Sequence, residues 1–186
     1  MAWETLSNMS TIRPAYSLME TAYDDYANGV SGVTDPTKPC PQRGITNQCA
    51  VRMSVALVRC GLSLDAFTPR ERVHRGHCGL QVHHVLGAQE LERYLRRIMG
   101  TPVEYLNLTR DRRVGQRIYE SILGRKGIIY FNDMFTRPDG TGGDHIDLFN
   151  GRLCYNHIIR ITPGGNTSHQ TQTYFHKATK ISFFKL

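Results

Sequence analysis

Apolar residues recur at helical spacing through the first two thirds of the chain. From Asn47 onward, four of them fall on a single helical face and Gly61 ends the pattern. They are Val51, Val55, Val58 and Leu62. Similar spacing predicts helices over residues 15–27, 87–99 and 114–123, each followed by a glycine stop signal.

After residue 126 the apolar residues form short continuous runs, which are typical of buried strands. They predict strands over residues 127–131, 146–149, 153–161 and 181–186. Helices followed by an antiparallel sheet indicate an α+β fold, with the helical N-terminal part packed on the C-terminal sheet. A length of 186 residues suits one core. We therefore expect residues 1–186 to form a single domain.

The composition is basic, with a net charge of +7, and predicts an anionic partner. Several arginines on the predicted helices could grip an anionic polymer or form solvated helix faces. They are Arg93, Arg96, Arg97, Arg110, Arg112 and Arg113. A nucleic-acid-binding module is the hypothesis from a different class, but the chain lacks interleaved aromatics and any recognised nucleic-acid motif. We expect no nucleic-acid partner, no membrane span and no signal peptide.

Cys49 falls in the first turn of the helix that we expect Asn47 to cap. The unpaired N–H groups and the positive end of the helix dipole there favour a thiolate, which makes Cys49 a candidate nucleophile. The cysteine count of five leaves at least one thiol free unless chains cross-link. The sequence leaves open whether the other four, Cys40, Cys60, Cys78 and Cys154, form disulfides.

Asn150-Gly151 stands between two predicted strands and is a strong hairpin signal. A two-residue loop would place His145 directly opposite Asn156, close enough for the amide to orient the imidazole. A bulged turn would instead bring His157 opposite. Asp147 shares a strand face with His145 and is the alternative orienting residue.

The chain order cysteine, histidine, asparagine is that of papain-like hydrolases. In that chemistry His145 takes the thiol proton, Cys49 attacks an amide carbonyl, and water hydrolyses the resulting thioester. The Cys49 backbone N–H helps to stabilise the oxyanion. We expect no cofactor.

A second cluster contains zinc-ligand residue types, His74, His77, Cys78, His83 and His84. Its spacing fits no regular zinc motif. We therefore expect no metal and interpret the segment as a basic, solvated loop with one buried cysteine.

Two blocks carry a specific resemblance. Residues 47–57, NQCAVRMSVAL, together with residues 124–130 and 145–151, GRKGIIY and HIDLFNG, resemble the type VI secretion system amidase effectors of family 4. The resemblance implies a papain-like fold related to NlpC-type cell-wall peptidases. It also implies Cys49 as nucleophile and His145 as base, whereas the family commonly has an aspartate at the position of Asn156.

The same resemblance implies an antibacterial toxin that leaves the producing cell's cytoplasm through the type VI secretion apparatus and acts in the periplasm of a rival. Such enzymes cut peptidoglycan stem peptides between D-glutamate and meso-diaminopimelate, and a cognate immunity protein blocks them. A papain-like protease or isopeptidase acting on a protein substrate is the alternative within the same chemistry.

Overall fold

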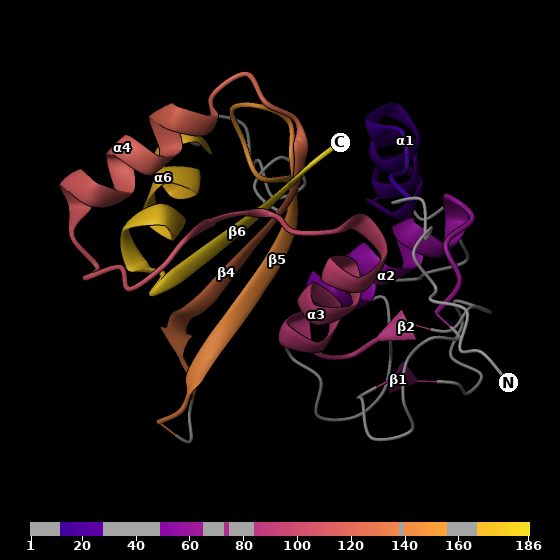
Figure 1. Ribbon diagram of the computed structural model, residues 1–186, viewed down its shortest axis with the longest axis horizontal. Helices are drawn as coiled ribbons and strands as arrows, with labels where there is room; N and C mark the ends of the chain where they lie inside the picture. Colours follow the sequence, from indigo (N-terminus) through magenta and orange to yellow (C-terminus); the bar gives the residue numbers. More distant parts are fainter. Residues whose placement is uncertain (1–11, 28–48, 65–72, 75–83, 138–139, 156–166) are drawn as a thin grey trace, which may run out of the picture.

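A four-stranded antiparallel sheet of order β3-β6-β4-β5 lies between two groups of helices in the computed structural model (Figure 1). The structure describes residues 12–27, 49–64, 73–74, 84–137, 140–155 and 167–186. The strands of this sheet are β3 (Val103–Tyr105), β4 (Gly127–Thr136), β5 (Gly142–Phe149) and β6 (Lys180–Lys185). The predicted α+β class with an antiparallel sheet is confirmed.

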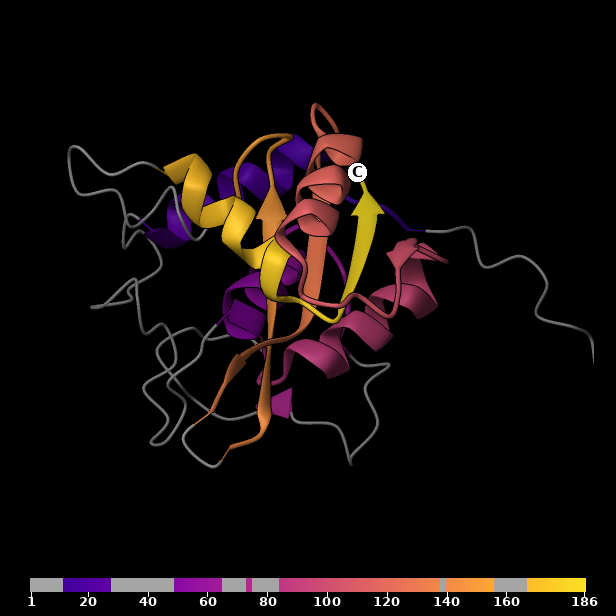
Figure 2. The same ribbon diagram turned by 90° about the vertical axis from the view of Figure 1, so that its left-hand side faces the viewer.

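The helices divide between the two faces of this sheet. On one face lie α1 (Tyr16–Ala27), α2 (Cys49–Arg59) and α3 (Ala88–Met99). On the other lie α4 (Arg112–Ile122) and α6 (Thr167–Lys177), which stand in front of the sheet when it is viewed from that side (Figure 2). The four predicted helices are therefore confirmed as α1 to α4.

Side chains of β5 alternate between two hydrophobic clusters, as the pleat of a strand requires. Ile146 and Leu148 belong to the cluster under α1, α2 and α3. Phe149 belongs to the cluster under α4 and α6. His145 and Asp147 share the face of Phe149, since they lie at two-residue spacing from it.

Helix α2 is more deeply buried than its one-sided apolar pattern predicts. Nine consecutive residues from Cys49 to Leu57 are buried, including Arg52 and Ser54. Helices that are buried on all sides belong to the interior of a fold rather than its surface. The candidate nucleophile thus begins a central helix.

The predicted strand over residues 153–161 is wrong in the part that the structure describes. Cys154 forms only an isolated bridge with Phe149, and Tyr155 is helical. The cause is the turn, because the Asn150 side chain accepts hydrogen bonds from the amides of Arg152, at 3.0 Å, and Leu153, at 2.7 Å. The Asn150 amide also donates to the Leu153 carbonyl at 3.0 Å, which closes a longer turn than the predicted two-residue loop.

This longer turn also overturns the expected register, in which His145 faces Asn156 across a tight hairpin. The partner of Phe149 is Cys154 instead of Arg152. Asn156 itself lies outside the described residues, as do Asn47, Cys40 and Cys78. Four described elements were not predicted: β1 (Val73–His74), β2 (His84–Val85), β3 and α6.

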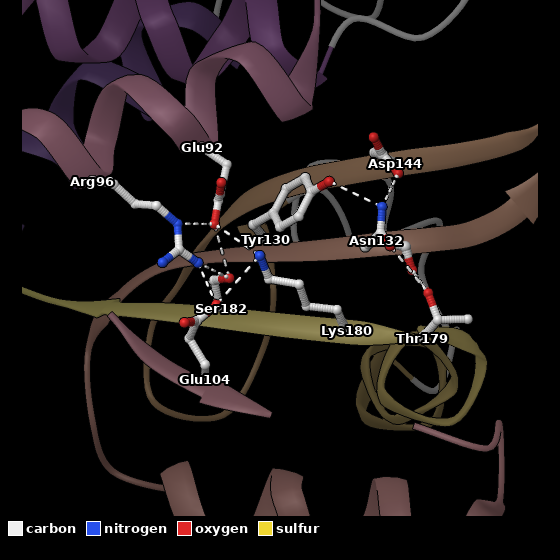
Figure 3. A network of polar contacts seen from close by, with 9 residues as sticks. All are labelled: Glu92, Arg96, Glu104, Tyr130, Asn132, Asp144, Thr179, Lys180 and Ser182. Atoms are coloured by element: carbon white, nitrogen blue, oxygen red, sulfur yellow. Dashed lines mark hydrogen bonds and ion pairs between the residues drawn. The ribbon is translucent and has the colours of Figure 1, made fainter. Parts of the chain in front are cut away.

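A polar network anchors α3 to the sheet on the face opposite His145 (Figure 3). The buried Glu92 carboxylate accepts hydrogen bonds from Arg96 Nε at 2.6 Å and from Ser182 Oγ at 3.0 Å. Arg96 also binds Glu104 on β3, and Lys180 Nζ lies 3.3 Å from the same carboxylate. Hydrogen bonding to Arg96 lowers the pKa of Glu104, so this network keeps the Glu104 carboxylate ionised.

Helices α4 and α6 touch at Gly115. A Cβ atom added there would lie 2.6 Å from the Phe175 carbonyl oxygen and from the His176 ring. Such distances are shorter than real Cβ contacts, and one of the atoms belongs to the backbone. The two helices therefore need glycine at this position to pack against each other.

Gly115→Ala should destabilise the fold by about 1–3 kcal/mol, because the added methyl group overpacks the contact between α4 and α6. The neighbouring Gln116→Ala is the control and should change the free energy of unfolding by less than about 0.5 kcal/mol. Chemical denaturation of both variants measures the effect. Equal stability of the two would contradict the close contact.

Candidate active site

Cys49 is the first residue of α2, and 7% of its surface is exposed. The prediction that it lies in the first turn of a helix is confirmed. The N–H groups of a first turn have no partner within their own helix, so they can polarise the thiol and bind an anion beside it. Cys49 begins the helix that packs on β5, one of the two edge strands of this sheet.

His145 on β5 is the partner of Cys49. It hydrogen-bonds the cysteine side chain, and 3% of its surface is exposed. Two aromatic rings fix its orientation: Phe131 stacks on it with centroids 6.3 Å apart, and Tyr174 meets it edge-on at 4.9 Å. Cys49 and His145, far apart in the sequence, are brought together by the packing of α2 on β5.

Asp147 is the third member of the cluster. Its Oδ2 lies 3.5 Å from His145 Nε2, and both side chains are almost completely buried. At this distance the contact is an ion pair rather than a well-formed hydrogen bond, and Nε2 has no hydrogen-bond partner among the described residues. Because Nε2 faces Asp147, Nδ1 is left for the Cys49 thiol.

The surroundings of His145 favour its charged form. Burial alone would lower its pKa, but the close Asp147 carboxylate and the contact with Cys49, together with the negative charges of both groups, raise the pKa to about 9. The imidazole is therefore protonated at neutral pH, beside two groups that are anionic when deprotonated. This is the charge arrangement of a thiolate–imidazolium pair.

Tyr23 and Arg52 complete the buried surroundings, and neither was predicted as a site residue. Burial and the charge of Asp147 raise the pKa of Tyr23 well above its ordinary value, while the Arg52 guanidinium acts in the opposite direction. Tyr23 stays a neutral phenol whose ring packs edge-on against Tyr155, with centroids 5.5 Å apart. The helical spacing of Tyr23 marked it only as a core residue, and a charged residue such as Arg52 is ordinarily expected in solvent.

Among the described cysteines, only Cys49 has a histidine partner. Cys49, Cys60 and Cys154 are all free thiols. Burial raises the pKa of Cys154 well above its ordinary value, and burial likewise raises the pKa of Cys60. Those two thiols are therefore poor nucleophiles at neutral pH.

The other candidate features have mixed outcomes. The short strands β1 (Val73–His74) and β2 (His84–Val85) pair His74 with His84, while His77, Cys78 and His83 lie outside the described residues. Within the described part of the chain, no three histidine, cysteine or acidic residues are grouped as a metal site requires. In the same residues, no helix is long and apolar enough to cross a bilayer.

Two of the arginines proposed to grip an anionic polymer are engaged in ion pairs within the protein. Arg96 belongs to the Glu92 network, and Arg110 Nη2 lies 2.5 Å from Asp133 Oδ2. Arg112 and Arg113 line a surface depression on α4. The ion pairs of Arg96 and Arg110 leave less positive charge for a continuous nucleic-acid-binding surface.

The raised His145 pKa should make the contribution of Asp147 to stability depend on pH. The contribution is fully present below the ordinary histidine pKa of about 6.5 and is lost as pH rises through about 9. The difference in unfolding free energy between wild type and Asp147→Asn should therefore shrink across this window. Chemical denaturation from pH 6 to pH 10 measures it.

Asp144→Asn is the control for that measurement, because Asp144 faces the other side of the sheet and accepts a hydrogen bond from Asn132 at 2.9 Å. Its effect should not follow the same pH window. A stability difference for Asp147→Asn that stays constant from pH 6 to pH 10 would disprove the charge coupling.

Comparison with known proteins identifies a family and similar folds. Residues 45–184 match the family described as type VI secretion system amidase effector protein 4, Tae4. The fold is similar to the crystal structure of Tae4 from Enterobacter cloacae, with a TM-score of 0.61 and 18% identity over 95% of this chain and 99% of that one. No curated protein matches the sequence.

Two structures of complexes are also similar. One is the Tae4–Tai4 effector–immunity complex from Enterobacter cloacae, with a TM-score of 0.61 and 18% identity over 94% of this chain and 99% of that one. In the other, Tae4 from Salmonella typhimurium is bound to the immunity protein Tai4 from Enterobacter cloacae, with a TM-score of 0.59 at the same identity and coverage. Because the family match spans well over half of the sequence and includes both Cys49 and His145, the chain belongs to the Tae4 family of type VI secretion amidase effectors.

Proposed function

We propose that the chain is a cysteine amidase in which Cys49 is the nucleophile and His145 the general acid and base. The observation that carries the proposal is the buried contact between the first residue of α2 and a histidine whose pKa is raised to about 9. Membership of an amidase family supplies the reaction class. The contact supplies the residues able to perform it.

The first half of the reaction forms a thioester. The Cys49 thiolate attacks the substrate carbonyl carbon, and the negative charge that develops on the oxygen faces the N–H groups at the start of α2. The intermediate collapses as the carbon–nitrogen bond breaks. Protonated His145 gives its proton to the departing nitrogen, so that a neutral amine leaves and a neutral imidazole remains.

The second half hydrolyses the thioester. Neutral His145 now accepts a proton from water, whose oxygen attacks the thioester carbonyl. The carbon–sulfur bond breaks, the new carboxyl group leaves, and the thiolate–imidazolium pair is restored. The Asp147 carboxylate, 3.5 Å from Nε2, stabilises the imidazolium at the stages where it is charged.

The proposed substrate is the peptide stem of peptidoglycan, and the proposed bond is that between D-glutamate and meso-diaminopimelate. Family membership favours a cell-wall amide over other amides. The net charge of +7 also suits a substrate with free carboxylates. A protein substrate cut by the same chemistry is the alternative, and mass spectrometry of the products separates the two.

The wider role follows the family. The mixed α+β structure with a nucleophile at a helix start is consistent with a papain-like, NlpC-type fold, and we propose residues 1–186 as one catalytic domain. Complexes of similar effectors with the immunity protein Tai4 support a cognate immunity protein for this chain. We propose that the type VI secretion apparatus delivers the enzyme to the periplasm of a target bacterium, where it acts as a toxin.

Cys49→Ala should reduce the release of new amino groups from purified sacculi by roughly a thousandfold or more, because the thioester cannot form. His145→Ala should cause a loss of similar size. Cys60→Ala is the matched control and should keep full activity. Undiminished hydrolysis by Cys49→Ala would disprove the mechanism.

Asp147 and Asn156 should have separable effects on the same assay. Asp147→Asn should move the basic limb of the pH profile of kcat/KM below about 9, because the imidazolium loses a stabilising charge. Asn156→Ala should lower the rate less than His145→Ala, with a smaller shift of the profile. A harmless Asn156→Ala combined with a loss in Asp147→Ala equal to that of His145→Ala would assign the orienting role to Asp147.

A further inference from the structure

A surface cavity lies on the same face of the sheet as His145. It has a volume of about 450 Å³ and is lined by Arg110, Met134, Phe135, Thr136, His176 and Lys177. The catalytic chemistry described above uses none of these residues. They come from the outer part of β4, from the end of α6 and from the segment before α4.

The strand register places this cavity close to the catalytic histidine. Phe131 pairs with His145, and Phe135 pairs with Gly143, with a bulge in β4 between the two pairs. Gly143 shares the face of His145 and lies two residues away, roughly 7 Å along the strand. The Phe135 ring covers it so closely that a Cβ atom on Gly143 would lie 2.2 Å from the ring. Phe135, which lines the cavity, therefore lies over the strand position two residues from His145.

The lining combines positive charge with apolar walls. Lys177 is exposed and makes no ion pair with any described residue, so its charge is available to a ligand. Met134 and Phe135 are half-buried beside it. Apolar walls lower the local dielectric, which strengthens the attraction between a cation and an anionic group.

Arg110 is held at the cavity by an unusual backbone arrangement. Arg110 and Asp133 both adopt left-handed conformations, with φ of 58° and 50°. The Arg110 guanidinium donates to the Asp133 carbonyl at 3.0 Å and to its carboxylate at 2.5 Å. Non-glycine residues in this region are costly, and they persist where the surrounding structure fixes them, commonly at functional sites. The remaining N–H groups of the Arg110 guanidinium are therefore held in a fixed position, from which they can donate to a second acceptor.

We propose that this cavity binds a free carboxylate of the peptide substrate, next to the amide that Cys49 attacks. Lys177 supplies the charge, Arg110 supplies further N–H donors, and Phe135 carries the intervening chain. The proposal rests on the function proposed above, and it assigns Lys177 and Arg110 to substrate specificity rather than to catalysis.

The test compares wild type, Lys177→Gln and the control Lys185→Gln, whose exposed lysine lies on β6 and lines no part of this cavity. The substrates are a synthetic stem peptide with free carboxylates and two analogues, one amidated at the glutamate carboxylate and one at the diaminopimelate side-chain carboxylate. Kinetics give kcat and KM for each pair. Calorimetry with Cys49→Ala, alone and combined with Lys177→Gln, gives binding without turnover.

Lys177→Gln should lower kcat/KM on the free peptide by roughly three- to tenfold, through KM with little change in kcat. The loss of kcat/KM in Lys177→Gln should disappear on one of the two amidated analogues, and that analogue identifies the bound carboxylate. Lys185→Gln should match wild type on all three. In the Cys49→Ala background, Lys177→Gln should weaken binding of the free peptide by the same factor.

An equal loss on free and amidated peptides, or no loss on any, would overturn the carboxylate site. Absence of hydrolysis by wild type would instead reject the proposed function, and the binding measurement would still decide on the cavity. Binding of the free peptide that Lys177→Gln leaves unchanged would reject the cavity in that case also. Arg110→Gln compared with Arg112→Gln offers a second matched pair for the same readouts.

Discussion

The site depends on burying a positively charged imidazole. A charge removed from water is costly unless opposite charges compensate for it, and His145 has two such groups in Cys49 and Asp147. The two come from different elements, since Asp147 shares β5 with the histidine whereas Cys49 begins α2. A stable folded state therefore favours the arrangement that the chemistry needs, because α2 must dock where its first residue meets β5.

The two faces of the sheet carry separate tasks. On the α3 face, the Glu92 network satisfies its charges internally and ties a helix to β3 and β6 (Figure 3). On the α6 face, Phe131 and Tyr174 enclose His145 with aromatic surface instead. The polar network that anchors α3 is thus kept away from the reacting groups.

Local patterns in the sequence predicted the helices and the helix-start position of Cys49 well. Caps, glycine stops and apolar spacing act within one element, so α1 to α4 and the position of Cys49 could be predicted from them. Helix α6 has a polar sequence, TSHQTQTYFHK, without a clear apolar face. It packs against α4 at Gly115, and this contact joins residues that are far apart in the sequence. Strand β3 has three residues and exists because β6 is beside it. Elements of this kind depend on partners that no local pattern contains.

The predicted two-residue turn after β5 was wrong for a related reason, and the error affects the pairing assigned to one side chain, His145. Asn-Gly favours a two-residue loop, but the Asn150 carbonyl oxygen also accepts from two amides further along, and this capping lengthens the turn. The pairing register beyond the turn then shifts, so a cross-strand partner assigned by counting residues from a two-residue loop is no longer correct. The prediction for Asp147 does not depend on the turn, because its position beside His145 follows from the two-residue period of a strand. A partner on the same strand is therefore the more secure inference from sequence, and the 3.5 Å contact between the two buried side chains has this origin.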